Sequence, residues 1–184
     1  MRDAADLARF VAGRPAMLDR LATVAAHGPP HAWIGAGFLR NAVWDALTGR
    51  DPDAIPPADL DVVFHDAADA SPERDAAAEA ALSAAAPGLP WSVANQARMH
   101  ARNGHAPYRD LAEALAHWPE TATAVAARLG PRGVEILAPH GLEDLFALIA
   151  RPTPAHRAQP AAMLARIAAK AWTTRWPALR LLAE

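Results

Sequence analysis

Residues 33–64 contain the stretch that decides the fold: Gly35-Ala36-Gly37-Phe38-Leu39-Arg40-Asn41-Ala42-Val43-Trp44-Asp45-Ala46-Leu47-Thr48-Gly49-Arg50, then a proline-rich loop, then Asp59-Leu60-Asp61-Val62-Val63-Phe64. A brief apolar run that ends in glycine predicts a buried strand over residues 31–35. Apolar side chains then recur on one side of a helix from Leu39 to Leu47, and Gly49 is placed to end that helix. The glycine-rich turn therefore connects a strand to a helix.

This turn is a candidate phosphate site. Gly35, Ala36 and Gly37 offer small side chains, free backbone N–H groups and a helix N-terminus to an anion. The alternative is a tight turn that needs glycine only for its backbone dihedral angles. Arg40, one turn into the helix, could neutralise phosphate charge at the same place, although an isolated helical arginine is usually solvated.

Two aspartates mark the second strand, which we predict over residues 59–64. Asp59 and Asp61 are two apart, so on a strand their carboxylates lie on one face and crowd negative charge. Mg²⁺ prefers such hard oxygen ligands, and with two ions the pair would support phosphoryl transfer. Taken alone, an Asp-x-Asp motif is more often an exposed strand end or a loop cap.

The remaining elements follow from periodicity and from turn residues. Alanine favours a helix over residues 121–129, but the β-branched side chains there and the Gly130-Pro131-Arg132-Gly133 turn favour a hairpin. We expect two short helices over residues 3–27, a helix over 72–86, a strand over 91–95, a helix over 108–117, a hairpin over 121–137, and helices over 141–149 and 163–176.

Composition limits the function classes. The chain has 18 Lys and Arg against 20 Asp and Glu, so its formal charge of −2 excludes a strongly basic nucleic-acid-binding arm. With 52% apolar residues it can bury a core, and its length suits one domain. It has no cysteine, which excludes thiolate chemistry. No apolar run is long enough for a membrane span or secretory signal, so we expect a cytoplasmic protein.

The order of these parts matches a known family. The segment from Gly35 to Arg50, followed by Asp59-Leu60-Asp61, resembles the nucleotidyltransferase fold of the DNA polymerase β superfamily and is similar to the head of tRNA CCA-adding enzymes and poly(A) polymerases. Residues 91–105, 118–124 and 138–146 look more closely like a bacterial family of small nucleotidyltransferase-like proteins. The resemblance implies an α/β (α+β) fold with a mixed twisted sheet flanked by helices. It covers residues 33–176 of a single domain, with a core over 31–139 and a helical C-terminal part over 140–184.

The resemblance also implies an activity and a site. The activity is a Mg²⁺- or Mn²⁺-dependent transfer of a nucleoside monophosphate from an NTP to a hydroxyl group. Asp59 and Asp61 would be the catalytic metal ligands. The implied nucleotide-binding residues are Gly35, Ala36, Gly37, Arg40 and Asn41.

Active members of the superfamily take a third carboxylate from the following strand. The matching position here would be Asn95, which is neutral and is a poor proton acceptor. Glu120 or Glu135 would supply the charge if the hairpin folds back to the site. In addition, Asn41 follows Arg40 where CCA-adding enzymes have Asp, and the loop before Asp59 is longer than theirs, which argues against a tRNA-specific activity.

Three interpretations stay open at this point. The first is an enzyme whose acceptor is a small molecule, an RNA end or a protein hydroxyl. The second is a catalytically degenerate module that binds a nucleotide or a protein partner, as an antitoxin-like protein would. The third is a structural protein. The basic face of Arg166, Lys170 and Arg175 on the last helix is expected to be only solvated, and the sequence leaves the oligomeric state open.

Overall fold

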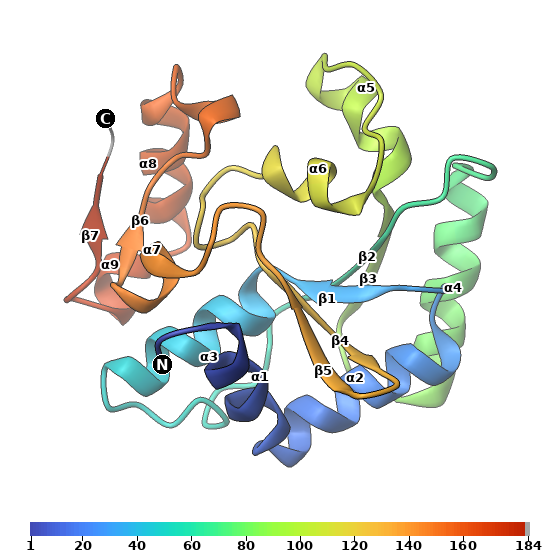
Figure 1. The fold of residues 1–184 in the computed structure, drawn as a ribbon, viewed down its shortest axis with the longest axis horizontal. Coiled ribbons are helices and arrows are strands. Elements are labelled where there is room, and N and C mark those ends of the chain that lie inside the picture. The colour runs from blue at the N-terminus through green and yellow to red at the C-terminus, as the bar shows by residue number, and fades with distance from the viewer. Residues whose placement is uncertain (183–184) are drawn as a thin grey trace.

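A five-stranded mixed sheet forms the centre of the computed structural model, which describes residues 1–182 (Figure 1). Its strand order is β3-β2-β1-β4-β5, with β2 and β3 parallel and every other neighbouring pair antiparallel. The mixed sheet predicted from the sequence is confirmed. The strands are β1 (Trp33–Gly35), β2 (Leu60–Phe64), β3 (Trp91–Asn95), β4 (Ala126–Gly130) and β5 (Gly133–Leu137).

Helices cover both faces of this sheet. The larger hydrophobic core lies on one face, where Leu60, Val62 and Phe64 of β2 pack with buried residues of the N-terminal helices. On the other face, Val63 packs against Leu111 and Leu115. The helices up to this point of the chain are α1 (Ala4–Ala12), α2 (Pro15–His27), α3 (Gly37–Leu47), α4 (Pro72–Ala85), α5 (Met99–Asn103) and α6 (Leu111–Ala116), with a 3-10 turn η1 (Gln96–Arg98) before α5.

The C-terminal part packs against α3, to one side of the sheet in Figure 1. Trp44 of α3 is fully buried, and its ring meets those of Trp172 and Trp176 edge to face at centroid distances of 5.6 Å and 5.1 Å. The elements of this part are α7 (Glu143–Phe146), β6 (Ile149–Ala150), a 3-10 turn η2 (Pro154–His156), α8 (Pro160–Ala169), α9 (Trp172–Arg175) and β7 (Arg180–Leu181), of which β6 and β7 pair in parallel. The predicted part over 140–184 includes residues 183–184, which lie outside the described residues.

Most element boundaries follow local signals. The Asp3 side chain accepts a hydrogen bond from the backbone N–H of Asp6 and so caps α1, while Asp110 caps α6 in the same way through Glu113. Proline at the first helical position begins α2 and α4, as expected from its fixed φ angle.

Three expectations are corrected. The hairpin begins only at Ala126, because residues 120–125 form buried turns around the carbonyl oxygen of Glu120. The helix expected over 141–149 is α7 alone, since Ile149 joins β6. The helix expected over 163–176 is interrupted at Ala171, whose φ of 50° turns the chain so that Trp172 meets Trp44. Among residues 1–182 no helix has the length and apolar character needed to cross a membrane.

Candidate active site

The turn between β1 and α3 has a strained and closely packed backbone. Ala36 has φ 54° and ψ −121°, a region that non-glycine residues rarely adopt, and its N–H donates to the carbonyl oxygen of Val125 at 3.0 Å. A Cβ atom on Gly35 would lie 2.8 Å from a ring carbon of Trp118. The Trp118 ring therefore packs directly on the backbone of this turn, which fixes its position.

The N-terminus of α3 is open to an anion. No side chain caps this end of the helix, and the first intrahelical hydrogen bond runs from Arg40 N to Ala36 O. The N–H groups of the residues between them consequently lack a partner within the helix. A Cβ atom on Gly37 would lie 3.2 Å from Asn41 Nδ2 and 3.6 Å from an Arg40 guanidinium nitrogen, so these side chains border the space beside Gly37.

Arg40 is a buried cation that has no carboxylate partner among residues 1–182. Its side chain donates to Thr123 Oγ1 and to Asn41 Oδ1, both at 2.8 Å, while its Nε is buried with no hydrogen-bond partner. No ion pair within 4 Å reaches its guanidinium from the part of the chain that the structure describes. Burial and then the charge of Arg166 lower its pKa to about 9. A bound anion would offset the free-energy cost of burying this charge.

The two aspartates lie beside this cation. Asp59 comes directly before β2, and Asp61 is the second residue of the strand, paired with Ser92 of β3. Burial, and then the negative charge of Asp59, raise the pKa of Asp61, while the charges of Lys170 and Arg40 act in the opposite direction. Asp59 is half exposed, and its Oδ2 lies 3.9 Å from Lys170 Nζ.

The carboxylates of Asp59 and Asp61 fit two coordination positions of a hard divalent cation. Two carboxylates that repel each other, both next to open space, are the ligands Mg²⁺ prefers, and water and substrate phosphates fill its remaining positions. Within residues 1–182 no group of three or more His, Cys, Asp or Glu side chains is arranged as a complete metal site.

The structure corrects the expected third position. Asn95 pairs with Phe64 and lies on the opposite face of the sheet from Asp61, because side chains alternate along a strand. Its Nδ2 donates to the carbonyl oxygens of Asp66 and Asp69, at 2.7 Å and 3.0 Å, and its Oδ1 accepts from Asp66 N at 3.0 Å. Asn95 therefore holds the loop after β2. The residue of β3 beside Asp61 is Ser92.

The two alternative carboxylates are both engaged elsewhere. Glu135 is part of the hairpin and pairs with Arg128 at 2.6 Å. Glu120 is fully buried and accepts two hydrogen bonds from Arg166, and its charge opposes the lowering of the Arg40 pKa. Glu120 thus contributes to the electrostatics of the site as the partner of Arg166.

Sequence reasoning missed the contribution of the C-terminal part. Arg166 and Lys170, expected to be only solvated, reach Glu120 and Asp59 respectively, and Arg175 pairs with Asp45 at 2.5 Å. The spacing of four residues between Arg166 and Lys170 was a usable signal, because it puts both side chains on one side of a helix.

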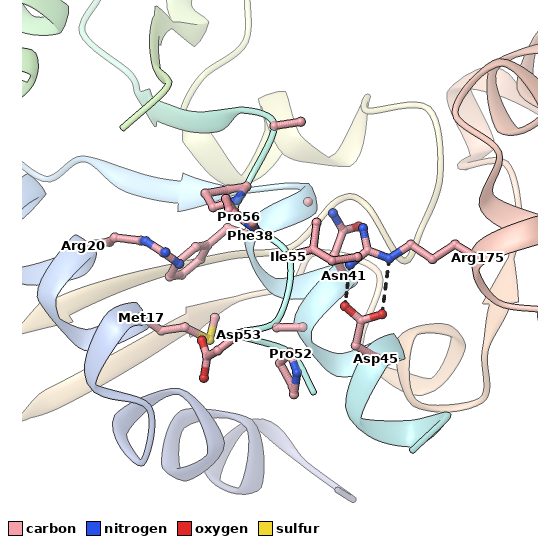
Figure 2. Close-up of a pocket in the computed structure, with 14 residues that line it drawn as sticks. Met17, Arg20, Phe38, Asn41, Asp45, Pro52, Asp53, Ile55, Pro56 and Arg175 are labelled. Atoms are coloured by element: carbon pink, nitrogen blue, oxygen red, sulfur yellow. Dashed lines mark hydrogen bonds and ion pairs between the residues drawn. The ribbon is translucent and has the colours of Figure 1, made fainter. Parts of the chain in front are cut away.

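One cavity lies beside the N-terminal part of α3, between this helix, α2 and the loop before Asp59 (Figure 2). Asn41 and Gly37 line it together with Met17, Phe38 and prolines of the loop before Asp59, and the ion pair between Arg175 and Asp45 lies at one side. Its volume is about 120 Å³. The cavity that contains Asp61 is larger, about 220 Å³, and lies between β2, β3, Trp118 and Arg166.

Comparison with known proteins agrees with this geometry. The sequence model of a family described as Nucleotidyltransferase matches residues 22–181, which is most of the chain. A protein whose NMR structure reveals a CCA-adding enzyme head domain is 29% identical, with a TM-score of 0.84 over 99% of this chain and 97% of the other. No curated protein sequence matches the chain significantly.

Two larger enzymes share the fold at lower identity. The Thermotoga maritima CCA-adding enzyme complexed with tRNA has a TM-score of 0.60 at 18% identity, and a CCA-adding enzyme in complex with CTP has one of 0.57 at 19% identity. Each match covers 98% of this chain, but this chain spans only 42% and 43% of their respective lengths. Their likeness therefore concerns the fold of one part of each enzyme.

Proposed function

Because the chain belongs to the nucleotidyltransferase family, we propose that it transfers a nucleoside monophosphate from an NTP to a hydroxyl group in a metal-dependent reaction. The observation that carries the proposal is Arg40, a buried cation without a carboxylate partner among the described residues, placed beside Asp61 and the open N-terminus of α3. A triphosphate is the anion that this arrangement accepts best.

The chain's own residues would hold the triphosphate as follows. The backbone N–H groups at the start of α3 would bind its terminal phosphates, and Arg40 and Lys170 would neutralise the charge that develops on the leaving pyrophosphate. The acceptor oxygen forms a bond to the α-phosphorus, the bond from that phosphorus to the bridging oxygen breaks, pyrophosphate leaves, and the hydroxyl proton passes to water.

Asp59 and Asp61 are the residues that would hold Mg²⁺ or Mn²⁺. A bound divalent ion supplies positive charge to the phosphate oxygens and lowers the pKa of a coordinated hydroxyl. Burial and then the charge of Asp59 raise the Asp61 pKa, and a bound divalent cation would offset both effects.

We propose that the core over 31–139 and the C-terminal part over 140–184 act as one unit. Arg166 and Lys170 come from the C-terminal part, yet they pair with Glu120 and Asp59 of the core. CCA-adding enzymes of similar fold form complexes with tRNA, with CTP and with ATP. For this chain we propose an NTP as one partner.

The second candidate is a module that binds a nucleotide without turnover. Ser92, which stands beside Asp61 on β3, carries no charge, so the site has two carboxylates where an active superfamily member would have three. A protein of this kind would bind the nucleotide at the same site but would not catalyse the transfer.

Pyrophosphate release tests the proposal and separates the two candidates. Each NTP is incubated with the protein, Mg²⁺ or Mn²⁺ and a set of hydroxyl acceptors (a nucleoside, a nucleoside monophosphate, a short RNA and a serine-containing peptide). Pyrophosphate is measured for the wild type, Asp61→Asn and the control Asp19→Asn, which removes an exposed carboxylate on α2. The proposal predicts release that Asp61→Asn abolishes and Asp19→Asn preserves. NTP binding without release in the presence of every one of these acceptors would favour the second candidate, and the absence of both binding and release would contradict the nucleotide site.

A further inference from the structure

Two cavities share one pair of lining side chains. The first contains Asp61 and Ser92, and the second extends along η1, α5 and α6 with a volume of about 360 Å³; Gln96 and Trp118 line both. We call these two adjoining cavities together, from Ser92 in the first to Arg102 in the second, the acceptor groove. Its second cavity lies within the roughly 300–1,000 Å³ typical of small-molecule pockets.

The sheet order places this groove where an acceptor must enter. Asp61 lies on β2, which has β1 and the phosphate-binding turn on one side and β3 with Ser92 on the other. In a displacement at phosphorus, the attacking and leaving oxygens lie roughly in line on opposite sides of the phosphorus atom. With the triphosphate on the β1 side of Asp61, the incoming hydroxyl comes from the β3 side, which is the inner end of the acceptor groove.

The walls of the groove suit a flat ring with hydrogen-bonding edges. Gln96 is 5% exposed, and its Nε2 donates to Ala94 O at 3.2 Å while its Oε1 accepts from Trp118 Nε1 at 3.3 Å. Both side chains are therefore fixed before a ligand arrives. Trp118 packs on Gly35 with one part of its ring and lines both cavities, so its ring offers a stacking surface.

The charge of the second cavity points to a single anionic group. Arg102 is the one charged residue in its lining, and no carboxylate of the described residues lies within ion-pair distance of it. The neighbouring arginines differ, because Arg98 pairs with Asp75 and Arg109 with Glu113. A polynucleotide would need several cations for its phosphates, and the chain has a net charge of −2.

We propose that the acceptor is a small hydroxyl compound with one flat ring and one anionic group. Its ring stacks on Trp118 and meets Gln96, its anionic group binds Arg102, and its hydroxyl reaches the Ser92 end beside Asp61. This inference rests on the proposed function and deepens it by naming the acceptor class.

Adenosine 5′-monophosphate and uncharged adenosine are matched probes, since they differ only in the anionic group. Their binding is measured by calorimetry on protein saturated with Mg²⁺ and an α,β-methylene NTP analogue, which cannot release pyrophosphate. The monophosphate should bind at least tenfold more tightly than adenosine. Arg102→Ala should abolish that difference, whereas Arg132→Ala, on the exposed hairpin turn, should preserve it. A ten-residue single-stranded oligoadenylate should bind no more tightly than the monophosphate.

The outcomes separate this inference from the function on which it rests. If the analogue binds but the monophosphate shows no advantage over adenosine, or Arg102→Ala leaves the advantage intact, the acceptor groove is wrong while the nucleotide site stands. A tenfold preference for the oligoadenylate would also overturn the inference in favour of a polynucleotide. Failure of the analogue itself to bind would overturn the proposed function, and the inference with it.

Discussion

The guanidinium carbon of Arg40 lies 3.9 Å from the centroid of the Trp172 ring, which joins the first turn of α3 to the C-terminal part. Arg166 approaches the same ring at 5.4 Å, so one indole is shared by two cations. This aromatic contact partly replaces the carboxylate that a buried arginine usually has. Among the described residues the guanidinium has no carboxylate within ion-pair distance, so a bound anion would supply the charge partner that it lacks.

Replacing Arg40 should stabilise the unliganded protein. Because its pKa is lowered to about 9, the folded state holds the proton less tightly than the unfolded state. Stability therefore rises with pH only above about 9, and the full cost of the buried charge is present at pH 7. Arg40→Met should raise the free energy of unfolding at pH 7 by about 1 kcal/mol, or the melting temperature by about 2–4 °C. Thermal unfolding without ligand measures this.

The same variant should lose the response to nucleotide. Mg²⁺ and NTP should stabilise the wild type and leave Arg40→Met unchanged, because the cation that binds the phosphates is gone. Arg132→Met, which changes an exposed arginine on the hairpin turn, is the matched control and should keep the response. A stabilising response to NTP in Arg40→Met equal to that of the wild type would contradict the role given to Arg40.

Lys170 provides a chemical report on the site because it is the only lysine in the sequence. An amine-specific acylating reagent can modify Lys170 and the α-amino group of Met1, so the latter is an internal reference. Bound NTP should slow the modification of Lys170, which lies 3.9 Å from Asp59, in the presence of Mg²⁺ and leave Met1 unaffected. Peptide mass spectrometry measures both rates, and equal rates with and without NTP would contradict the placement of Lys170.

Ala36 should respond to relief of backbone strain. A non-glycine residue at φ 54° and ψ −121° costs about 1–3 kcal/mol, whereas glycine costs about 0.5–1 kcal/mol in lost chain entropy on folding. Ala36→Gly should therefore stabilise the fold by about 1 kcal/mol, and Ala36→Val should destabilise it. Urea unfolding of the wild type and the two variants measures their free energies of unfolding. A lower value for Ala36→Gly than for the wild type would contradict the strain at this turn.

His105 should make stability depend on pH below neutrality. Burial, then the charges of His117 and His156, lower its pKa. A histidine whose folded pKa lies below its unfolded value of about 6.5 contributes stability above that value, and this contribution is lost as pH falls from about 6.5 through the lowered pKa. His105→Asn should flatten the pH dependence in this window. The free energy of unfolding is measured by urea unfolding between pH 7 and pH 5. The same pH dependence in His105→Asn as in the wild type would contradict this prediction.

The sequence predicted the sheet and the turn because their signals are local. Alternation in Asp59-Leu60-Asp61, glycine at both ends of the turn between β1 and α3, and proline at helix starts each act within a few residues. Asn95 was misplaced because the face of a strand depends on register with its neighbour, which places Ser92 rather than Asn95 beside Asp61. The break at Ala171 follows from packing of Trp172 on Trp44, a contact between distant segments that no local pattern encodes.

The most direct measurement of the central claim is thermal unfolding with each NTP, with and without Mg²⁺ or Mn²⁺, for the wild type and Asp61→Asn. At about 100 times its dissociation constant, the preferred NTP should stabilise the wild type by about 2.7 kcal/mol, which is several degrees for a chain of this size. The account predicts that this shift requires the metal and is lost in Asp61→Asn. The absence of a shift with every NTP, or an equal shift in the variant, would contradict a nucleotide site built on Arg40 and Asp61.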